Sequence, residues 1–359
     1  MFLKPSIVTP DGPCLVPDDG LRQVCVVLLS GIGDVVHGLP LAHDIKRLDP
    51  RTEVVWVAEG APAEVLAHHS AVDRVIVFDS RAGIGGVRSL RRAMAGINAQ
   101  LTLNVQRYFK SVWPSAFSGS GVRVGLPTSK TRDGVSLFNT HAVQDGPWKH
   151  TQDLFLDFRW ALGVPRDAPV SWEIALSDKD VAEKDAFFRR LDGRPVASLV
   201  VASANPRKDW PAHRYAQLAD VLATDFGFQV LLLGGPAPHE RQAVATILDH
   251  SRTDPRDELG DSVRRLMGLL SGSDLVVAPD TGPLHIAHAL GTPVIGLFAH
   301  TNPWRVGPYR DFHDLVVDRY TEPGAEPDPS GYLPKDSGME GITLEDVLEK
   351  VEVARSRYL

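Results

Sequence analysis

Apolar positions along the chain follow two alternating patterns. Short, unbroken runs of apolar and β-branched residues are followed by longer segments in which apolar residues recur every three or four positions. The first pattern is typical of buried parallel strands and the second of amphipathic helices. Their alternation predicts βαβ units and parallel sheets over almost the whole chain.

In the first half, the pattern predicts strands at 23–29, 53–58, 74–78, 101–104 and 122–125. It predicts helices at 34–48, 61–68, 87–97 and 109–118, and a longer one at 150–163. The glycine-rich stretch at 82–87 lacks the spacing of a dinucleotide-binding loop, and we expect a flexible loop there.

After a polar, proline-containing stretch the alternation begins again. The pattern predicts strands at 196–202, 228–233, 274–278 and 293–298. It predicts helices at 211–225, 237–250, 262–271 and 283–290. A final helix at 343–357 has no strand after it, and we expect it to pack back across the domains.

These elements predict an α/β protein with two Rossmann-like, parallel-sheet domains that face a cleft at the carboxyl ends of both sheets. A chain of 359 residues is long enough for two such domains. We place an irregular, proline-containing arm at 1–21, an N-terminal domain at 22–165, a linker region at 166–195, a C-terminal domain at 196–335 and a crossover helix at 336–359.

Composition is that of an ordinary globular protein, with 43% hydrophobic and 23% charged residues. No apolar stretch approaches the roughly 18–20 residues of a membrane span. The two cysteines, Cys14 and Cys25, cannot form a disulfide framework, and this favours a reducing, cytoplasmic location.

Charge is unevenly distributed around the net value of −7. Residues 1–170 hold 18 basic and 16 acidic side chains, whereas the remainder holds 20 and 29. Within 74–132 there is one acidic residue, Asp79, and ten basic ones, Arg74, Arg81, Arg88, Arg91, Arg92, Arg107, Lys110, Arg123, Lys130 and Arg132. Such a block attracts anions, unless it is only a solvated helix face. Nucleic acid is disfavoured because the chain is acidic and has no nucleic-acid-binding motif.

The stretch "LLSGIGDVVHGLP" places a carboxylate directly after a glycine turn at the end of a strand. Ser30, Gly31 and Gly33 form the turn, and Asp34 stands at the start of the following helix. The carboxylate could merely favour the helix N-terminus. It could also perform chemistry from a fixed position at the end of the strand. The stretch alone leaves both interpretations open.

The stretch "VVAPDTGPLHIAHALGTPVIGLF" has the chemistry of a phosphate site. Helix N-terminal amides, the Thr281 hydroxyl and the bare backbone of Gly282 could cradle a phosphate. Alternatively, Asp280 is simply the N-cap of the helix. His285, one turn into the helix, could contact a phosphate or a ribose. A metal at His285 and His288 is disfavoured because further ligands are missing.

Two more loops follow strands of the second half. Lys208, in "ASANPRKDWPAHRYAQL", can reach a pyrophosphate as a point charge, although an exposed loop lysine is the simpler interpretation. In "LLLGGPAPHERQ" two glycines allow close backbone approach, and Glu240 could bind ribose hydroxyls or only favour the helix N-terminus. Asp178-Lys179-Asp180 matches the Asp-x-Asp of metal-dependent sugar transferases, but we interpret it as helix capping.

Together, "SGIGDVVHGLP", "KDWPAHRYAQLAD", "GGPAPHE" and "PDTGPLHIAHALGTPVIGLFAHTNPWRVGPY" resemble the bacterial ADP-heptose heptosyltransferases, glycosyltransferase family 9. The resemblance runs from about residue 22 to the end, and its Asp-Thr-Gly-x-x-His block is the most specific part. It implies a GT-B architecture with the acceptor in the N-terminal domain, the nucleotide-sugar in the C-terminal domain and no catalytic metal.

The resemblance also implies roles for individual residues. Asp34 would be the catalytic base, and Lys208 would stabilise the departing diphosphate. The donor-binding set is Gly33, Ser203, Lys208, Glu240, Asp280, Thr281, Gly282 and His285. The acceptor-binding set joins Gln106 and Lys110, which the resemblance implies, to basic residues of the charged block, Arg81, Arg88, Arg91 and Arg92.

The chain also departs from the family pattern. Asn302 stands where an aspartate is common, and Arg107 follows Gln106 where a glycine is frequent. The N-terminal arm is extra. These differences leave the donor sugar and the acceptor open.

We therefore expect an inverting, metal-independent transfer of a heptose from ADP-heptose to an acceptor hydroxyl in lipopolysaccharide inner-core assembly. The ADP-sugar is a co-substrate, and no cofactor is expected. We expect an anionic glycolipid acceptor, peripheral contact with the inner face of the cytoplasmic membrane, and a monomer. Three alternatives stay open: sugar transfer to a small secondary metabolite, a non-catalytic nucleotide-sugar-binding module, and a nucleotide-sugar epimerase.

Overall fold

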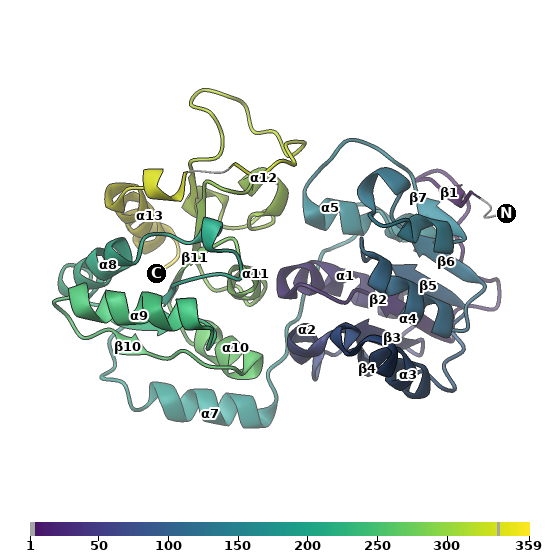
Figure 1. The fold of residues 1–359 in the computed structure, drawn as a ribbon, viewed down its shortest axis with the longest axis horizontal. Helices are drawn as coiled ribbons and strands as arrows, with labels where there is room; N and C mark the ends of the chain where they lie inside the picture. Colours follow the sequence, from purple (N-terminus) through teal and green to yellow (C-terminus); the bar gives the residue numbers. More distant parts are fainter. Residues whose placement is uncertain (1–3, 336–337) are drawn as a thin grey trace. The chain divides into compact units, whose positions relative to one another are not determined.

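The computed structural model describes residues 4–335 and 338–359, which form two compact units. Unit 1 comprises Met1–Pro147 and Thr151–Ala175, and unit 2 comprises Trp148–His150 and Leu176–Leu359. Each unit contains its own parallel sheet with helices against it (Figure 1). The prediction of two parallel-sheet α/β domains is confirmed.

Unit 1 contains a seven-stranded sheet in the order β1-β7-β6-β5-β2-β3-β4, and every pair is parallel. The strands are β1 Ser6–Val8, β2 Gln23–Val27, β3 Glu53–Ala58, β4 Arg74–Val77, β5 Leu101–Asn104, β6 Val122–Gly125 and β7 His141–Val143. The helices are α1 Ile32–Leu48, α2 Gly60–Leu66, α3 Gly83–Ala93, α4 Val112–Phe117, α5 Thr151–Leu156 and α6 Arg159–Leu162.

Helix α1 lies close to the centre of this sheet because Gly38 has no side chain. A Cβ atom at Gly38 would collide with the side chains of Leu28 and Trp56. Strands β2 and β3 are buried almost throughout, as the unbroken apolar runs predict. This packing holds the β2–α1 turn, and with it Asp34, on the most buried part of the sheet.

Three predictions for unit 1 were wrong. The N-terminal arm is not wholly irregular, because Ser6–Val8 pairs with β7; a three-residue edge strand is too short to show periodicity. Residues 83–87 are not a loop but the start of α3, where Gly86 allows the helix to approach the Asp79 carbonyl. The expected helix at 150–163 is divided into α5 and α6.

Unit 2 contains a six-stranded parallel sheet in the order β10-β9-β8-β11-β12-β13. The strands are β8 Val196–Val200, β9 Gln229–Leu233, β10 Arg256–Asp257, β11 Leu275–Pro279, β12 Val294–Phe298 and β13 Val316–Asp318. The helices are α7 Asp178–Phe188, α8 Ala212–Thr224, α9 Pro238–His250, α10 Val263–Ser271, α11 Gly282–Ala289, α12 Pro303–Val306 and α13 Leu344–Arg357.

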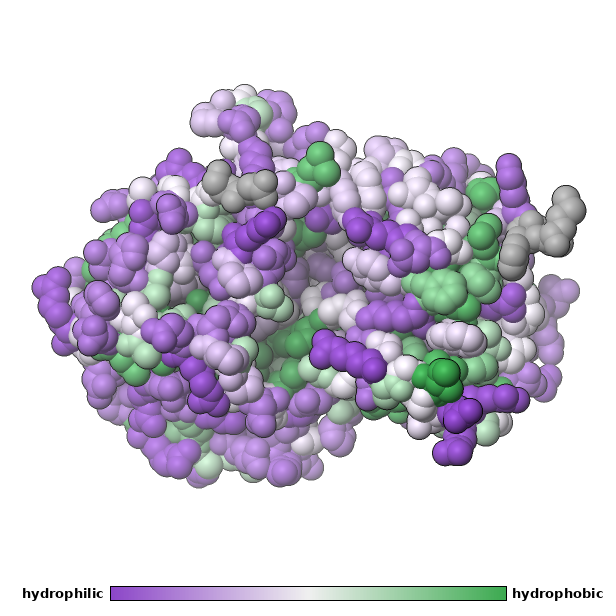
Figure 2. Space-filling view, viewed as in Figure 1, coloured by the Kyte–Doolittle hydropathy of each residue, from purple (hydrophilic) through white to green (hydrophobic). Residues whose placement is uncertain are grey.

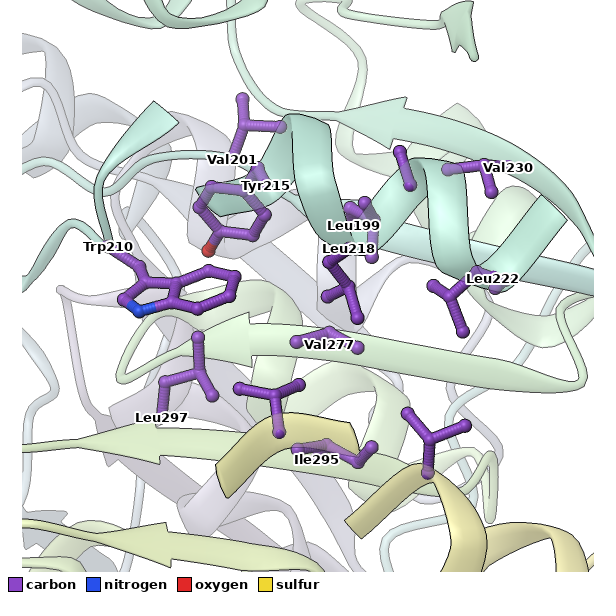
Figure 3. Packing of buried hydrophobic residues seen from close by; sticks show 14 of the residues in the cluster. Leu199, Val201, Trp210, Tyr215, Leu218, Leu222, Val230, Val277, Ile295 and Leu297 are labelled. Carbon is purple, nitrogen blue, oxygen red and sulfur yellow. The ribbon is translucent and has the colours of Figure 1, made fainter. Parts of the chain in front are cut away.

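The core of unit 2 lies between the sheet and helices α8, α9 and α13. Trp210, Tyr215 and Leu218 contact strand residues such as Val277 and Leu297 in this core (Figure 3). Helix α13 adds Val347, Val351 and Ala354 to the same cluster. Helix α13 therefore packs on the core of unit 2, and its packing across the domains stays a prediction. Among the described residues, no helix has the length and apolar character needed to cross a membrane.

Candidate active site

The carboxyl ends of parallel strands meet at one edge of a sheet, and this edge collects the predicted site residues of each unit. In unit 1 they follow β2 and β5. In unit 2 they follow β8, β9 and β11. Each unit therefore has one polar edge.

In unit 1, Asp34 lies in the first turn of α1 and is partly buried. The N-cap of α1 is Gly31, so the helix begins two residues before the predicted start. A carboxylate in this turn interacts favourably with the helix dipole. The position is compatible with either interpretation of Asp34, and its catalytic role stays a prediction.

A hydrogen-bond network fixes the turn that precedes Asp34. The Gln106 side-chain oxygen accepts hydrogen bonds from the backbone amides of Leu29 (2.7 Å) and Ser30 (3.2 Å). The Lys110 ammonium donates to Ser30 Oγ at 2.7 Å and to Glu59 Oε1 at 2.8 Å. The structure therefore gives Gln106 and Lys110, predicted as acceptor-binding, a structural role at the turn.

The network extends across four neighbouring strands. Ser80 also donates to Glu59 Oε1, so side chains that follow β2, β3, β4 and β5 are joined. The sequence analysis did not identify Ser30, Glu59 or Ser80 as partners. Their positions at strand ends could have identified them, because adjacent parallel strands bring the residues that follow them together.

The four predicted arginines lie elsewhere in unit 1. Arg81 belongs to a short 3₁₀ helix, Ser80–Ala82, and the other three lie on α3. All four side chains are exposed: Arg81, Arg88, Arg91 and Arg92. They form a group distinct from Gln106 and Lys110, which contact the Ser30 turn.

In unit 2, Lys208 and Asp280 form an ion pair between two loops. Lys208 Nζ lies 2.7 Å from Asp280 Oδ2 and also donates to the Asp280 backbone carbonyl at 3.2 Å. His285 Nε2 lies 3.6 Å from Asp280 Oδ1. Burial alone would raise the pKa of Asp280, but Lys208 and His285 hold that pKa well below its ordinary value. Asp280 therefore stays ionised and holds Lys208 at the sheet edge.

Thr301 completes this cluster and was not predicted from the sequence. Its hydroxyl donates to Asp280 Oδ2 at 2.8 Å, the same oxygen that receives Lys208. Thr301 comes three residues after the end of β12, which pairs with β11. Its position at the end of the adjacent strand is the signal that could have identified it.

Thr281, and not Asp280, is the N-cap of α11. The Asp280 carboxylate is turned toward Lys208, so its interpretation as a helix cap was wrong. Thr281 Oγ1 is buried and forms no hydrogen bond with any residue in the described part of the chain. Apart from Pro283, the first-turn amides of α11 have no acceptor within the helix. Hydroxyl and amides together offer donors to an anion.

Ser203 lies beside this cluster, at the end of β8. Its backbone amide and hydroxyl both donate to Asp209 Oδ1, at 2.7 and 2.8 Å. The His239 ring donates from Nε2 to the Ser203 carbonyl at 2.9 Å. Burial raises the pKa of Asp209. The loops after β8 and β9 are thus joined by residues that sequence reasoning missed.

Glu240 forms hydrogen bonds with the backbone of its own loop. Its carboxylate accepts hydrogen bonds from the amides of Gly235 (2.9 Å) and Ala237 (3.2 Å). A Cβ atom at Gly235 would lie 2.7 Å from Glu240 Oε2, so the glycine makes this approach possible. Glu240 was predicted either to bind ribose hydroxyls or to stabilise the helix N-terminus. The structure shows that it stabilises the N-terminus of α9. Ribose binding stays a prediction.

Comparisons with known proteins identify the family of the chain. The sequence model described as "Glycosyltransferase family 9 (heptosyltransferase)" matches residues 87–326. The "Lipopolysaccharide core heptosyltransferase OpsX" of Haemophilus influenzae is 31% identical over 326 residues, which are 90% of this chain and 92% of that protein. The chain belongs to glycosyltransferase family 9.

Other members of the family give the same picture. The "Lipopolysaccharide heptosyltransferase 1" of Pseudomonas aeruginosa is 28% identical, over 80% of this chain and 81% of that protein. The solved family 9 glycosyltransferase of Veillonella parvula has a TM-score of 0.78 at 20% identity, covering 93% and 97% of the two chains. E. coli heptosyltransferase WaaC with ADP has a TM-score of 0.73 at 22% identity, covering 92% and 99%. At sequence identities this low, the two structural similarities show that the fold is shared.

Asn302, where the family commonly has an aspartate, uses its amide nitrogen in the structure. Asn302 is buried, and its Oδ1 accepts from the Trp304 amide at 3.0 Å as the N-cap of α12. Its Nδ2 donates to the carbonyls of Asp328 (2.8 Å) and Gly331 (3.0 Å). An aspartate could accept from Trp304 but could not donate. In this family 9 member the amide therefore holds the loop around 328–331.

We expect Asn302→Asp to lower the free energy of unfolding by about 2–4 kcal/mol, because the carbonyls of Asp328 and Gly331 lose their donor and face a carboxylate at a buried position. Urea denaturation measures the loss, and limited proteolysis of the 321–335 loop should become faster. Asn98→Asp, at an exposed position, is the matched control and should change neither. Equal stability of the two variants would contradict the role of Asn302.

The two histidines of α11 differ in their surroundings. Both are buried, but His285 Nε2 lies 3.6 Å from Asp280 Oδ1, whereas His288 Nε2 lies 3.0 Å from the Tyr309 carbonyl. Within the residues that the structure describes, no three His, Cys, Asp or Glu side chains form a group that could hold a metal. The Asp-x-Asp stretch is a helix start, where Ser177 is the N-cap and Asp180 closes the capping box, as predicted.

Burial lowers the pKa of His288 from 6.5 to about 4. Between these values the unfolded chain binds a proton that the folded chain does not, so stability is complete above pH 6.5 and declines as the pH falls toward 4. The total loss from this residue is about 3 kcal/mol. Unfolding free energies measured against pH should show a shallower decline in His288→Gln than in the wild type. His250→Gln, at an exposed position, should keep the wild-type slope.

Proposed function

We propose that this glycosyltransferase is an inverting, metal-independent heptosyltransferase that uses ADP-heptose in lipopolysaccharide inner-core assembly. The names of its relatives support the pathway, since the Haemophilus influenzae protein is a lipopolysaccharide core heptosyltransferase. The solved E. coli family member contains ADP, which supports the nucleotide. The single observation that carries the proposal is the cluster of Lys208, Asp280 and the Thr281 N-terminus in unit 2.

This cluster has the chemistry that a departing diphosphate requires. As the bond between the anomeric carbon and the diphosphate breaks, negative charge accumulates on the leaving oxygens. Lys208 supplies a fixed positive charge, and Thr281 Oγ1 with the α11 amides supplies hydrogen-bond donors. Gly33, Ser203, Glu240, Gly282 and His285 remain proposed donor-binding residues. No metal or cofactor is needed in this scheme.

We assign the general base to Asp34. It would accept the proton of the acceptor hydroxyl as that oxygen attacks the anomeric carbon and ADP leaves. A single in-line displacement inverts the anomeric configuration. A base needs a fixed position. The turn before Asp34 is fixed because its backbone amides donate to Gln106 and because Lys110 donates to Ser30.

The basic side chains of unit 1 support an anionic glycolipid acceptor. Arg81, Arg88, Arg91 and Arg92 are exposed and would attract its phosphate and carboxylate groups. We place the reaction in the cytoplasm, at the inner face of the cytoplasmic membrane, and propose a monomer that binds no nucleic acid.

The test is a transfer assay with ADP-heptose and Kdo-bearing lipid A as the acceptor. Mass spectrometry should detect the addition of one heptosyl group to the acceptor. NMR should show that the anomeric configuration is inverted, and the rate of transfer should be unchanged when a metal chelator is added. UDP- and GDP-sugars are the controls and should give less product. Hydrolysis of ADP-heptose without transfer, or the absence of any turnover, would contradict the proposal.

A further inference from the structure

A long segment of unit 1 carries no negative charge. Residues 80–132 contain nine lysines and arginines and no aspartate or glutamate. Four of these cations donate to oxygen atoms of unit 1. They are Arg107 with the Lys130 carbonyl, Lys110 with Ser30 and Glu59, Arg123 with the Phe138 carbonyl, and Lys130 with the Gly146 carbonyl.

The first four cations of the segment have no such partners. The guanidinium groups of Arg81, Arg88, Arg91 and Arg92 are exposed, and none of them forms an ion pair or hydrogen bond within residues 4–335 and 338–359. The nearest acidic residue in the sequence, Asp79, accepts from the backbone amides of residues 81 and 82 through Oδ1. The unpaired positive charge is therefore concentrated on the 3₁₀ helix and α3.

Helix α3 also exposes an apolar side chain among these arginines. Ile84 is 73% exposed, whereas Leu90 and Met94 on the opposite face are buried in the core of unit 1. Residues 84, 88, 91 and 92 share one face, because residues 88, 91 and 92 follow Ile84 at four, seven and eight positions. From Ile84 to Arg92 this face extends about 12 Å along the helix. It is too long for a single phosphate and suits an array of them.

Neighbouring elements continue the apolar character. Val77, at the end of edge strand β4, is 57% exposed, and Trp113 on α4, which packs beside α3, is 40% exposed. Figure 2 shows apolar atoms among hydrophilic ones where α3 and α4 face the viewer in Figure 1. Exposed apolar side chains bordered by unpaired cations are typical of surfaces that bind a lipid interface.

We propose that the outer face of α3, with Arg81, Ile84, Arg88, Arg91 and Arg92, docks on an anionic phospholipid bilayer. The arginines bind lipid phosphates, and Ile84 enters the interface. This inference rests on the proposed function, in which the acceptor is carried by a lipid. Because the N-terminus of α3 follows β4 at the carboxyl edge of the sheet, docking would bring that edge close to the acceptor.

The experiment is flotation of the full-length protein with vesicles that contain neither acceptor nor donor. Vesicles of phosphatidylethanolamine and phosphatidylglycerol (3:1) should bind the protein, and phosphatidylcholine vesicles should not.

Each arginine near the membrane surface contributes about fivefold to the affinity for the vesicles. The triple variant Arg88→Gln, Arg91→Gln, Arg92→Gln should therefore bind about 10²-fold more weakly, and high salt should weaken the wild type in the same direction. The control triple variant Arg166→Gln, Arg189→Gln, Arg252→Gln removes the same charge elsewhere and should bind as the wild type does.

Ile84 distinguishes insertion from simple charge attraction. Ile84→Ser should bind the anionic vesicles about tenfold more weakly with unchanged thermal stability, because the side chain is exposed. Ile84→Trp should bind at least as well as the wild type, and its added fluorescence should shift to the blue with anionic vesicles only.

Two results would overturn the inference: equal binding to neutral and anionic vesicles, and anionic binding that survives the α3 triple variant. Binding of a soluble, delipidated acceptor without any vesicle binding would also overturn it, while leaving the transferase proposal intact. Vesicle binding with no sugar transfer would contradict the proposed function alone.

Discussion

Asp34→Asn is expected to lower the rate of sugar transfer by about 10²–10⁴-fold while the affinity for ADP stays unchanged. The amide has the shape of the carboxylate but cannot accept the acceptor proton. Asp34 lies in unit 1, whereas the proposed ADP-binding residues other than Gly33 lie in unit 2, so the two measurements separate catalysis from donor binding. Single-turnover kinetics with ADP-heptose and calorimetric titration with ADP provide them.

The control is Asp178→Asn, which removes an exposed carboxylate from the first turn of another helix, α7. Both variants lose an interaction with a helix dipole, which costs about 0.3–1 kcal/mol, and both should therefore show a similar, small decrease in thermal stability. Transfer by Asp34→Asn at the wild-type rate would show that Asp34 only supports its helix. A large loss of stability would show that the carboxylate is structural.

Lys208→Met is expected to lower ADP affinity by more than tenfold and to reduce the free energy of unfolding by about 2–3 kcal/mol. ADP affinity falls because the substitution removes the positive charge that is proposed to face the diphosphate. The free energy of unfolding falls because Asp280, which is buried, loses its cation and keeps Thr301 and His285 as side-chain partners. Because Lys208 is 24% exposed, the expected cost is below that of a fully buried pair.

A double-mutant cycle separates the two effects. Asp280→Asn in the Lys208→Met background removes the unpaired carboxylate and should restore part of the lost stability, but it should not restore ADP binding. Lys179→Met, at an exposed position on α7, is the control and should change neither quantity. If the double variant regained ADP affinity, or if Lys208→Met bound ADP normally, Lys208 would be only the partner of Asp280.

Much of the fold was predictable because buried parallel strands leave a strong sequence signal. The run before Ser30 and the run before Pro279 are unbroken apolar segments, and both became central strands, β2 and β11. The missed strands β1, β7, β10 and β13 have at most three residues, and all of them except β7 lie at sheet edges. Strands this short depend on their neighbours, so their own sequence carries little of the signal.

For the site, the sequence identified the loops better than the contacts within them. It placed Lys208 and Asp280 in separate strand-end loops, but only the structure shows that they bind each other and that Thr281 caps α11. Thr301 and Glu59 were missed because they act through residues distant in the sequence. A side chain's partner depends on which strands are adjacent.

The sequence by itself determined two parallel α/β units, the positions of their buried strands, and the strand-end loops that carry Asp34, Lys208 and the Asp-Thr-Gly segment. These features follow from local periodicity and turn chemistry, which act over a few residues. The tertiary structure alone decided which polar groups meet, Asp280 with Lys208 and Gln106 with the Ser30 turn. It also decided that α13 packs on the core of unit 2. Strand order sets these meetings, and it is fixed by long-range packing of the whole core.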